Sequence, residues 1–123
     1  NNEVVMPGWV RECHLPIIYS GATAFVFPSN YEGFGIPLLQ AMACEVPIIA
    51  SKSSSIPEVV ADAAILVDPD DTDAIIDSLR NIATNEKVRE ELINKGKKRI
   101  QKFSWEITAI NTLKVINSFA KKE

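Results

Sequence analysis

Three short, wholly apolar runs, each as long as a typical strand, constrain the fold of this chain more than any other feature. They occupy residues 24–27, 47–50 and 64–67, and stretches typical of short helices separate them. Strands that are apolar on both faces suit a parallel sheet covered by helices on each side. A further apolar run at residues 4–6 ends in a Pro-Gly turn and is interpreted as another buried strand. The sequence therefore predicts an α/β fold whose parallel sheet has about four strands.

Helical patterns replace the strands after residue 70. Asp71 or Thr72 can cap a helix that runs to about residue 83, and Asn85 can cap a second helix from residue 86 to about residue 102. Ser104 can cap a terminal helix, against whose neighbours Trp105 is expected to pack. One side of that helix carries an apolar stripe of Ile107, Ile110, Leu113, Ile116 and Phe119. We therefore treat residues 1–123 as one domain, with an α/β core (1–70) and C-terminal helices (71–123).

Composition narrows the classes of function. The 123 residues suffice for one domain, and a net charge of −3 argues against general nucleic-acid binding, which needs a basic surface. The sequence has no apolar run of about 18 residues, so no membrane-spanning helix is expected. Two cysteines, Cys13 and Cys44, without C-x-x-C spacing and a single histidine, His14, match no familiar zinc pattern. We expect no metal site and two reduced thiols, as in a cytoplasmic protein.

A carboxylate and two glycines stand directly before a predicted helix that starts near Pro37. Gly33 and Gly35 let the backbone approach a ligand closely, because neither has a Cβ. Glu32 is an acceptor suited to hydroxyl groups. Local chemistry alone leaves two interpretations open, a ligand loop or an ordinary tight turn between strand and helix.

The start of the predicted helix favours anions. The N–H groups of Ile36, Leu38 and Leu39 are expected to be free there, at the positive end of the helix dipole. Amides that bind phosphate beside a carboxylate that binds hydroxyls would together suit a sugar phosphate or a nucleotide sugar.

Residues 32–44, with the sequence EGFGIPLLQAMAC, resemble the signature of retaining glycosyltransferases of family 4, which have the GT-B fold. Further matches come in the family's order at Gly8-Trp9-Val10 and at residues 25–29, 47–51, 57–60, 67–69 and 103–105. The resemblance covers essentially the whole chain. It implies a Rossmann-like parallel sheet within part of a GT-B C-terminal domain. The family's N-terminal acceptor domain and its basic upstream segment, which neutralises the donor diphosphate, are expected to be absent from this chain.

The resemblance also implies roles for individual residues. Glu32 matches the catalytic glutamate that contacts hydroxyls of the donor sugar. The backbone of Gly33, Phe34, Gly35 and Ile36 matches the loop that lines the sugar and the distal phosphate.

Three further positions match the nucleotide side of the donor site. Leu38 and Leu39 stand where backbone amides meet phosphate, and Val10 lies in the region whose backbone reads the nucleobase. Gln40 occupies the position of the family's second glutamate, which binds the ribose diol. Because glutamine lacks the charge, we expect weaker or altered nucleotide binding rather than none.

The implied function is donor binding in a retaining transferase that moves a hexose from a UDP- or GDP-sugar to a glycan or lipid acceptor, without a metal cofactor. This chain alone is expected to be inactive, and to associate with itself through an exposed sheet edge and apolar helix faces. The full-length enzyme is expected in the cytoplasm, peripheral at the inner membrane face. Two alternatives stay open: a non-catalytic nucleotide-sugar module that works with a partner chain, and a structural remnant with a decayed site.

Overall fold

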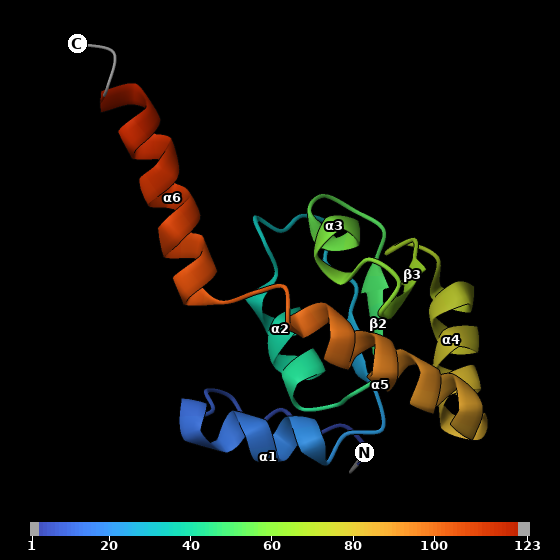
Figure 1. Ribbon diagram of the computed structural model, residues 1–123. Helices are drawn as coiled ribbons and strands as arrows, with labels where there is room; N and C mark the ends of the chain where they lie inside the picture. Colours follow the sequence, from blue (N-terminus) through green and yellow to red (C-terminus); the bar gives the residue numbers. More distant parts are fainter. Residues whose placement is uncertain (1–2, 121–123) are drawn as a thin grey trace.

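The computed structural model describes residues 3–120, which form a parallel sheet with helices on both faces (Figure 1). The elements in chain order are η1 (Glu12–His14), α1 (Leu15–Ser20), β1 (Phe25–Phe27), α2 (Ile36–Ala43), β2 (Ile48–Ser51), α3 (Ile56–Val60), β3 (Ala64–Val67), α4 (Thr72–Thr84), α5 (Glu86–Ile100) and α6 (Trp105–Ala120). The strands pair in the order β1-β2-β3, all in parallel. The predicted α/β class is therefore confirmed.

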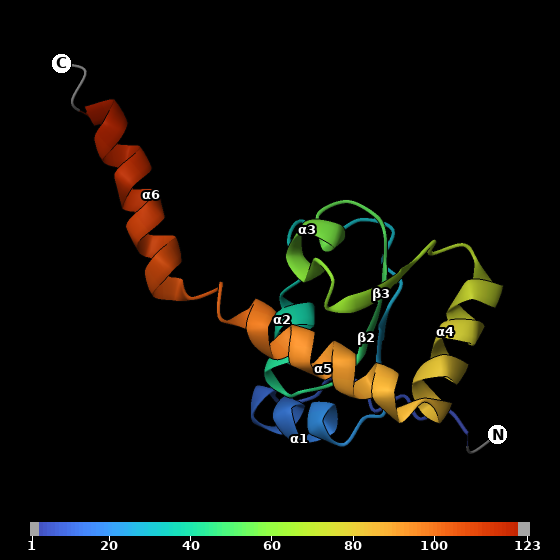
Figure 2. The same ribbon diagram turned by 45° about the vertical axis from the view of Figure 1, so that its right-hand side comes forward.

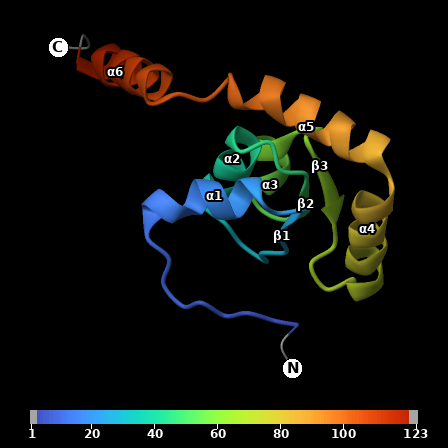
Figure 3. The same cartoon turned by 90° about the horizontal axis from the view of Figure 1, so that it is seen from below.

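The sheet of the described residues has three strands rather than about four. Val4, Val5 and Met6 form no strand, and they are 76%, 80% and 89% exposed. Figure 3 shows this segment as an extended piece of chain that does not join the sheet. A run of three residues becomes a strand only beside a partner that satisfies its backbone groups, and no described strand lies next to it. The prediction of a buried strand at residues 4–6 is therefore wrong.

The side chains of β2 alternate between two apolar cores, as the period of a strand requires. Ile48 and Ala50 face one core, which α2 and α3 complete, while Ile49 faces the other core. The second core also contains Val67 and residues of α4 and α5. Because helices cover both faces, every residue of β2 is buried, which explains why its first three residues are apolar.

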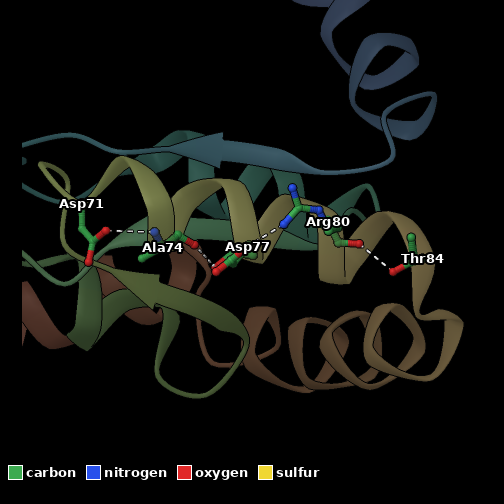
Figure 4. A network of polar contacts seen from close by, with 6 residues as sticks. Asp71, Ala74, Asp77, Arg80 and Thr84 are labelled. Carbon is green, nitrogen blue, oxygen red and sulfur yellow. Dashed lines mark hydrogen bonds and ion pairs between the residues drawn. The ribbon is translucent and has the colours of Figure 1, made fainter.

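Helix α4 begins at a side-chain cap that the sequence predicted. The carboxylate of Asp71 accepts a hydrogen bond of 2.9 Å from the N–H of Ala74, so Asp71 rather than Thr72 is the cap (Figure 4). Further along, Asp77 pairs with Arg80 at 2.9 Å, and the Thr84 hydroxyl donates to the carbonyl of Arg80. A local side-chain contact therefore determines where α4 starts.

Helix α5 lies across the molecule (Figure 2), where it packs against both α2 and α4. Asn85 caps it as predicted, by accepting from the N–H of Val88 at 3.4 Å. Near its middle, Gly96 lies against Met42 of α2, where an added Cβ would sit 3.5 Å from the Met42 side chain. Leu92 reaches the core on the other side of the sheet.

Helix α6 extends away from the rest of the molecule in all three views (Figures 1–3). Ser104 caps it, since its hydroxyl accepts from the N–H of Ile107 at 3.0 Å, as predicted. No residue of α6 is buried within residues 3–120. The expected packing of Trp105 is therefore wrong, because this side chain is 82% exposed.

Candidate functional site

Two loops meet at the carboxyl-terminal edge of the sheet, where ligands of parallel α/β folds bind. Residues 28–35 follow β1 and lead into α2, while residues 52–55 follow β2 and lead into α3. Parallel pairing of β1 with β2 brings the two loops to the same edge. The predicted site residues Glu32 to Leu39 lie in the first loop and in the first turn of α2.

Glu32 is the residue on which these two loops converge. Its carboxylate accepts a 2.9 Å hydrogen bond from the hydroxyl of Ser29, and its side chain is partly exposed. The backbone carbonyl of Glu32 accepts two more bonds, from Ser54 at 2.7 Å and from Ser55 at 2.9 Å. The structure therefore holds this carboxylate at the sheet edge while leaving it accessible to a ligand.

The two glycines of the loop differ in whether the fold requires a glycine at that position. Gly35 has a φ of +94°, a left-handed conformation that ends the loop and directs the chain into α2. An added Cβ there would also lie only 2.8 Å from the side chain of Leu38. A Cβ at Gly33 would meet no atom within 4 Å, so the space beside Gly33 is open. The fold itself therefore requires glycine at position 35, whereas the open space at Gly33 is available to a ligand.

The first turn of α2 offers a free amide at Ile36, one of the three expected. Within residues 3–120, the N–H group of Ile36, the first residue of the helix, donates no hydrogen bond. The N–H of Leu38 instead donates to the carbonyl of Gly35 at 3.0 Å. The expectation of a free Leu38 amide is wrong because the turn tightens into an i→i+3 bond, a common way to satisfy a helix start. The Leu38 side chain is fully buried in the core.

Phe34 joins the loop to the C-terminal part of the chain. Its ring is 45% exposed and makes an edge-to-face contact with Phe103, with the ring centroids 5.9 Å apart. Phe103 lies between α5 and α6, and the guanidinium of Arg99 sits 5.0 Å from its ring centroid. Arg99 in turn donates to the backbone carbonyls of Glu58 and Val59 in α3. The wall of the site beside Phe34 thus includes residues far away in the sequence.

Gln40 faces a pocket of about 300 Å³ between α1 and α2. The lining residues are Glu12, Leu15, Pro16, Tyr19, Gln40, Ala43 and Cys44. The hydroxyl of Tyr19 donates to the side-chain oxygen of Gln40 at 3.4 Å. Burial, reinforced by the nearby Cys44, raises the pKa of Tyr19 above its usual 10.0. Glu12 and Gln40 together give this pocket the acceptors that a diol would need.

Val10 lies apart from the other predicted residues. It is partly buried in the irregular segment before η1, and it does not line the pocket around Gln40. Its neighbour Trp9 is 83% exposed. The structure therefore brings Glu32 through Leu39 together, places Gln40 on the next turn of α2, and leaves Val10 outside this group.

A larger, open pocket of about 720 Å³ lies at the ends of β2 and β3, and four of its six lining side chains are carboxylates. The lining residues are Lys52, Asp68, Asp70, Asp71, Thr72 and Asp73. Lys52 and Asp68 pair at 3.3 Å. The lining charge disfavours a diphosphate, so this pocket is a poor donor site. In residues 3–120, no group of three or more histidine, cysteine, aspartate or glutamate side chains is placed to hold a metal.

The sequence analysis did not predict the hydrogen bonds that three serines make to Glu32. Ser29 stands three residues before Glu32, a spacing that allows a side-chain hydrogen bond within one turn of chain. Ser54 and Ser55 are 22 and 23 residues away, and only the pairing of β1 with β2 brings them near. The first contact has a local signal in the sequence, whereas the other two depend on the pairing of β1 with β2.

Several known proteins are similar to this chain. O-antigen chain mannosyltransferase B of Escherichia coli is 42% identical over 106 residues, which cover 86% of this chain and 28% of that protein. Alpha-maltose-1-phosphate synthase of Mycolicibacterium smegmatis is 41% identical over 87% of this chain and 31% of its own length. Sucrose-phosphate synthase from Thermosynechococcus elongatus superposes with a TM-score of 0.88 at 29% identity, over 99% of this chain and 31% of that one. The chain thus spans less than a third of the length of each.

The fold and the sequence agree on one family. The structural similarity confirms the prediction of a partial GT-B C-terminal domain, apart from the strand count. No described helix is long and apolar enough to cross a membrane. The family described as "Glycosyl transferases group 1" matches residues 1–99. The chain therefore belongs to the group 1 glycosyl transferases, as the resemblance of its glycine loop predicted.

Proposed function

We propose that this chain is the donor-binding part of a retaining glycosyltransferase that transfers a hexose from a nucleotide diphosphate sugar to a glycan or lipid acceptor. The observation that carries the proposal is the position of Glu32. Its carboxylate is held at the carboxyl edge of the sheet, four residues before the first turn of a helix with an unpaired amide at Ile36. Such a pairing suits a ligand that carries hydroxyls at one end and phosphates at the other.

In this proposal each part of the site meets one part of the donor. The carboxylate of Glu32 accepts hydrogen bonds from hydroxyls of the sugar and stabilises positive charge at the reacting carbon. The free amide of Ile36, at the start of α2, binds the diphosphate, and the open space beside Gly33 admits the sugar. Gln40 and its pocket take the ribose.

Mannose is the first hexose to test. Several similar proteins are named as mannosyltransferases, including the one from Escherichia coli and the MMP alpha-(1->4)-mannosyltransferase of Mycolicibacterium hassiacum. Others are named for maltose-1-phosphate or sucrose-phosphate synthesis, so the family name alone leaves the sugar open. We include in the proposal that this chain alone lacks transferase activity and that the complete enzyme works in the cytoplasm, at the inner membrane face.

An amide-resolved NMR titration with UDP, GDP and ADP, followed by the matching nucleotide sugars, tests the proposal. We expect one nucleotide to shift the amides of residues 33–39, and its sugar conjugate to add shifts near Glu32. In Glu32→Gln, the sugar-dependent shifts should disappear while the nucleotide-dependent shifts remain, because glutamine keeps the shape and loses the charge.

Glu106→Gln is the matched control, since it removes the same charge from α6, away from the site. It should leave every titration unchanged. If none of the three nucleotides shifts residues 33–39 in the unmodified chain, this chain does not bind a donor by itself and the proposal fails for it.

A further inference from the structure

We propose that Ser29, Ser51, Ser54 and Ser55 are positioning residues that hold Glu32 in the geometry its reaction needs. The inference rests on the function proposed above for Glu32. It adds that the orientation of this carboxylate depends on hydroxyl groups from two separate loops and from the end of β2.

The hydroxyl of Ser29 orients the side chain of Glu32. It has one proton and two acceptors within reach, the Glu32 carboxylate at 2.9 Å and the carbonyl of Tyr31 at 3.2 Å. The carboxylate is both nearer and charged, and hydrogen bonds to charged acceptors are about twice as strong as neutral ones. Within residues 3–120, Ser29 is the only group that donates to this carboxylate. Its bond therefore occupies one carboxylate oxygen and leaves the other for a ligand.

The hydroxyls of Ser54 and Ser55 hold the backbone at the same residue. A carbonyl oxygen has two lone pairs, so it accepts both bonds, of 2.7 Å and 2.9 Å, at the same time. Ser54 has a φ of +54°, which is uncommon for a residue with a side chain. The β2–α3 loop therefore adopts an unfavourable conformation at the residue that contacts Glu32.

Ser51 holds the backbone of Ser29 in place. It is the last residue of β2, it is fully buried, and its hydroxyl donates to the backbone carbonyl of Ser29. Ser51 therefore fixes Ser29, Ser29 orients the Glu32 side chain, and Ser54 and Ser55 fix the Glu32 backbone. Three hydroxyls thus bond directly to Glu32, and the fourth, of Ser51, holds the residue that bonds to its carboxylate.

Ser29→Ala removes the bond to the carboxylate and retains the backbone. We would measure the three-bond couplings from the backbone nitrogen and carbonyl carbon to Cγ of Glu32 in the labelled 123-residue chain, since these couplings report its χ1 rotamer. We expect one dominant rotamer in the unmodified chain, averaged couplings in Ser29→Ala, and recovery in Ser29→Thr, which restores the hydroxyl.

Ser53→Ala is the matched control in the neighbouring loop, because in the described residues the Ser53 side chain forms no hydrogen bond. It should leave the couplings of Glu32 unchanged. Couplings in Ser29→Ala that equal those of the unmodified chain would overturn the inference, whether or not any ligand binds.

Binding supplies a second readout that separates positioning from simple stabilisation. With GDP and GDP-mannose as probes, Ser29→Ala should weaken GDP-mannose on the order of tenfold while GDP affinity stays constant. Equal weakening of both probes would point to a structural role and count against positioning. If neither probe binds the unmodified chain, that result counts against the proposed function with this donor. The inference about the serines is then decided by the couplings of Glu32 alone.

Discussion

Helices α5 and α6 follow one another and have nearly equal lengths of 15 and 16 residues, yet they relate to the molecule in opposite ways. Helix α5 is rich in charge and buries Leu92 and Gly96, whereas α6 is richer in apolar residues and buries none within the described chain. The side chains of Leu113 and Phe119 in α6 are 57% and 69% exposed. The comparison teaches that apolar content alone does not bury a helix. Burial requires a facing surface, which α2 and α4 provide for α5.

The largest expected effect concerns association, because α6 and one edge of β1 are without partners among residues 3–120. We expect the chain to form dimers or larger species at high concentration, and Leu113→Asp/Ile116→Asp to shift it strongly toward monomer, since charges oppose apolar contact. Static light scattering over a concentration series measures this. Asn111→Asp/Ser118→Asp adds the same charge on the opposite side of α6 and should have little effect. A monodisperse unmodified monomer at high concentration would contradict the prediction.

The next largest effect concerns stability, and it compares a leucine-to-alanine substitution in α5 with one in α6. Leu92→Ala should lower the free energy of unfolding by about 2–3 kcal/mol, because it leaves a cavity in a packed core. Leu113→Ala should change it by no more than about 0.5 kcal/mol, since its side chain already contacts solvent. Urea unfolding followed by circular dichroism, at concentrations where the chain is monomeric, measures both. Equal losses would mean that α6 packs on the body in solution.

The anchoring of α5 by Arg99 gives a smaller effect. Arg99→Met removes the bonds to the carbonyls of Glu58 and Val59 and the contact with the Phe103 ring. We expect a loss of about 1–3 kcal/mol in the free energy of unfolding, because the carbonyl of Val59, in a partly buried contact, and the more exposed carbonyl of Glu58 lose their charged donor. Lys98→Met removes one exposed positive charge from the same turn and serves as the control. A loss as large in the control would show that charge alone matters.

The two helix caps should differ in what they stabilise. Asn85→Ala should lower the global free energy of unfolding by about 1 kcal/mol, because α5 is part of the folded core. Ser104→Ala should leave that value unchanged and speed amide exchange only in the first turn of α6. Hydrogen exchange measured residue by residue distinguishes the two. Global destabilisation by Ser104→Ala would contradict the independence of α6.

The smallest effect is the pH dependence that Lys95 contributes. Its hydrogen bond to Glu91, at 2.6 Å, and the charges of Glu91 and Asp62 raise the pKa of Lys95 above its usual 10.5. A raised lysine pKa stabilises the fold fully below about pH 10.5, and the contribution disappears as pH rises through the folded-state value. Lys95→Met should therefore show a shallower loss of stability between pH 10 and 12 than the unmodified chain. Lys114→Met on α6 makes a matched control, because Lys114 has no ion pair in the described structure.

Features that depend on near neighbours could be predicted from the sequence. The caps at Asp71, Asn85 and Ser104 each accept a hydrogen bond from the N–H of the residue three positions later. Both partners therefore lie within one short stretch of sequence. The three apolar strands and the helix after Gly35 were predictable for the same reason, since their patterns are local.

Features that depend on distant neighbours could not be predicted. Residues 4–6 have the composition of a strand, but only a partner strand makes one. The exposure of Trp105 depends on the direction that α6 takes. At the site, Glu32 and its glycines were evident from their motif, while the contacts of Ser54 with Glu32 and of Phe103 with Phe34 depend on the completed sheet and on α5.

The two glycines of the loop have a consequence for how this chain can diverge. Two features oppose substitution of Gly35. Its backbone is left-handed, and a Cβ there would clash with the side chain of Leu38, which is fully buried. Gly33 faces open space and carries neither restriction from the fold. Any selection against variation at Gly33 must therefore come from something outside the folded chain, such as a bound molecule. Across diverging copies of this chain, the variation tolerated at position 35 is limited by folding, whereas the variation tolerated at position 33 is limited by what the chain binds.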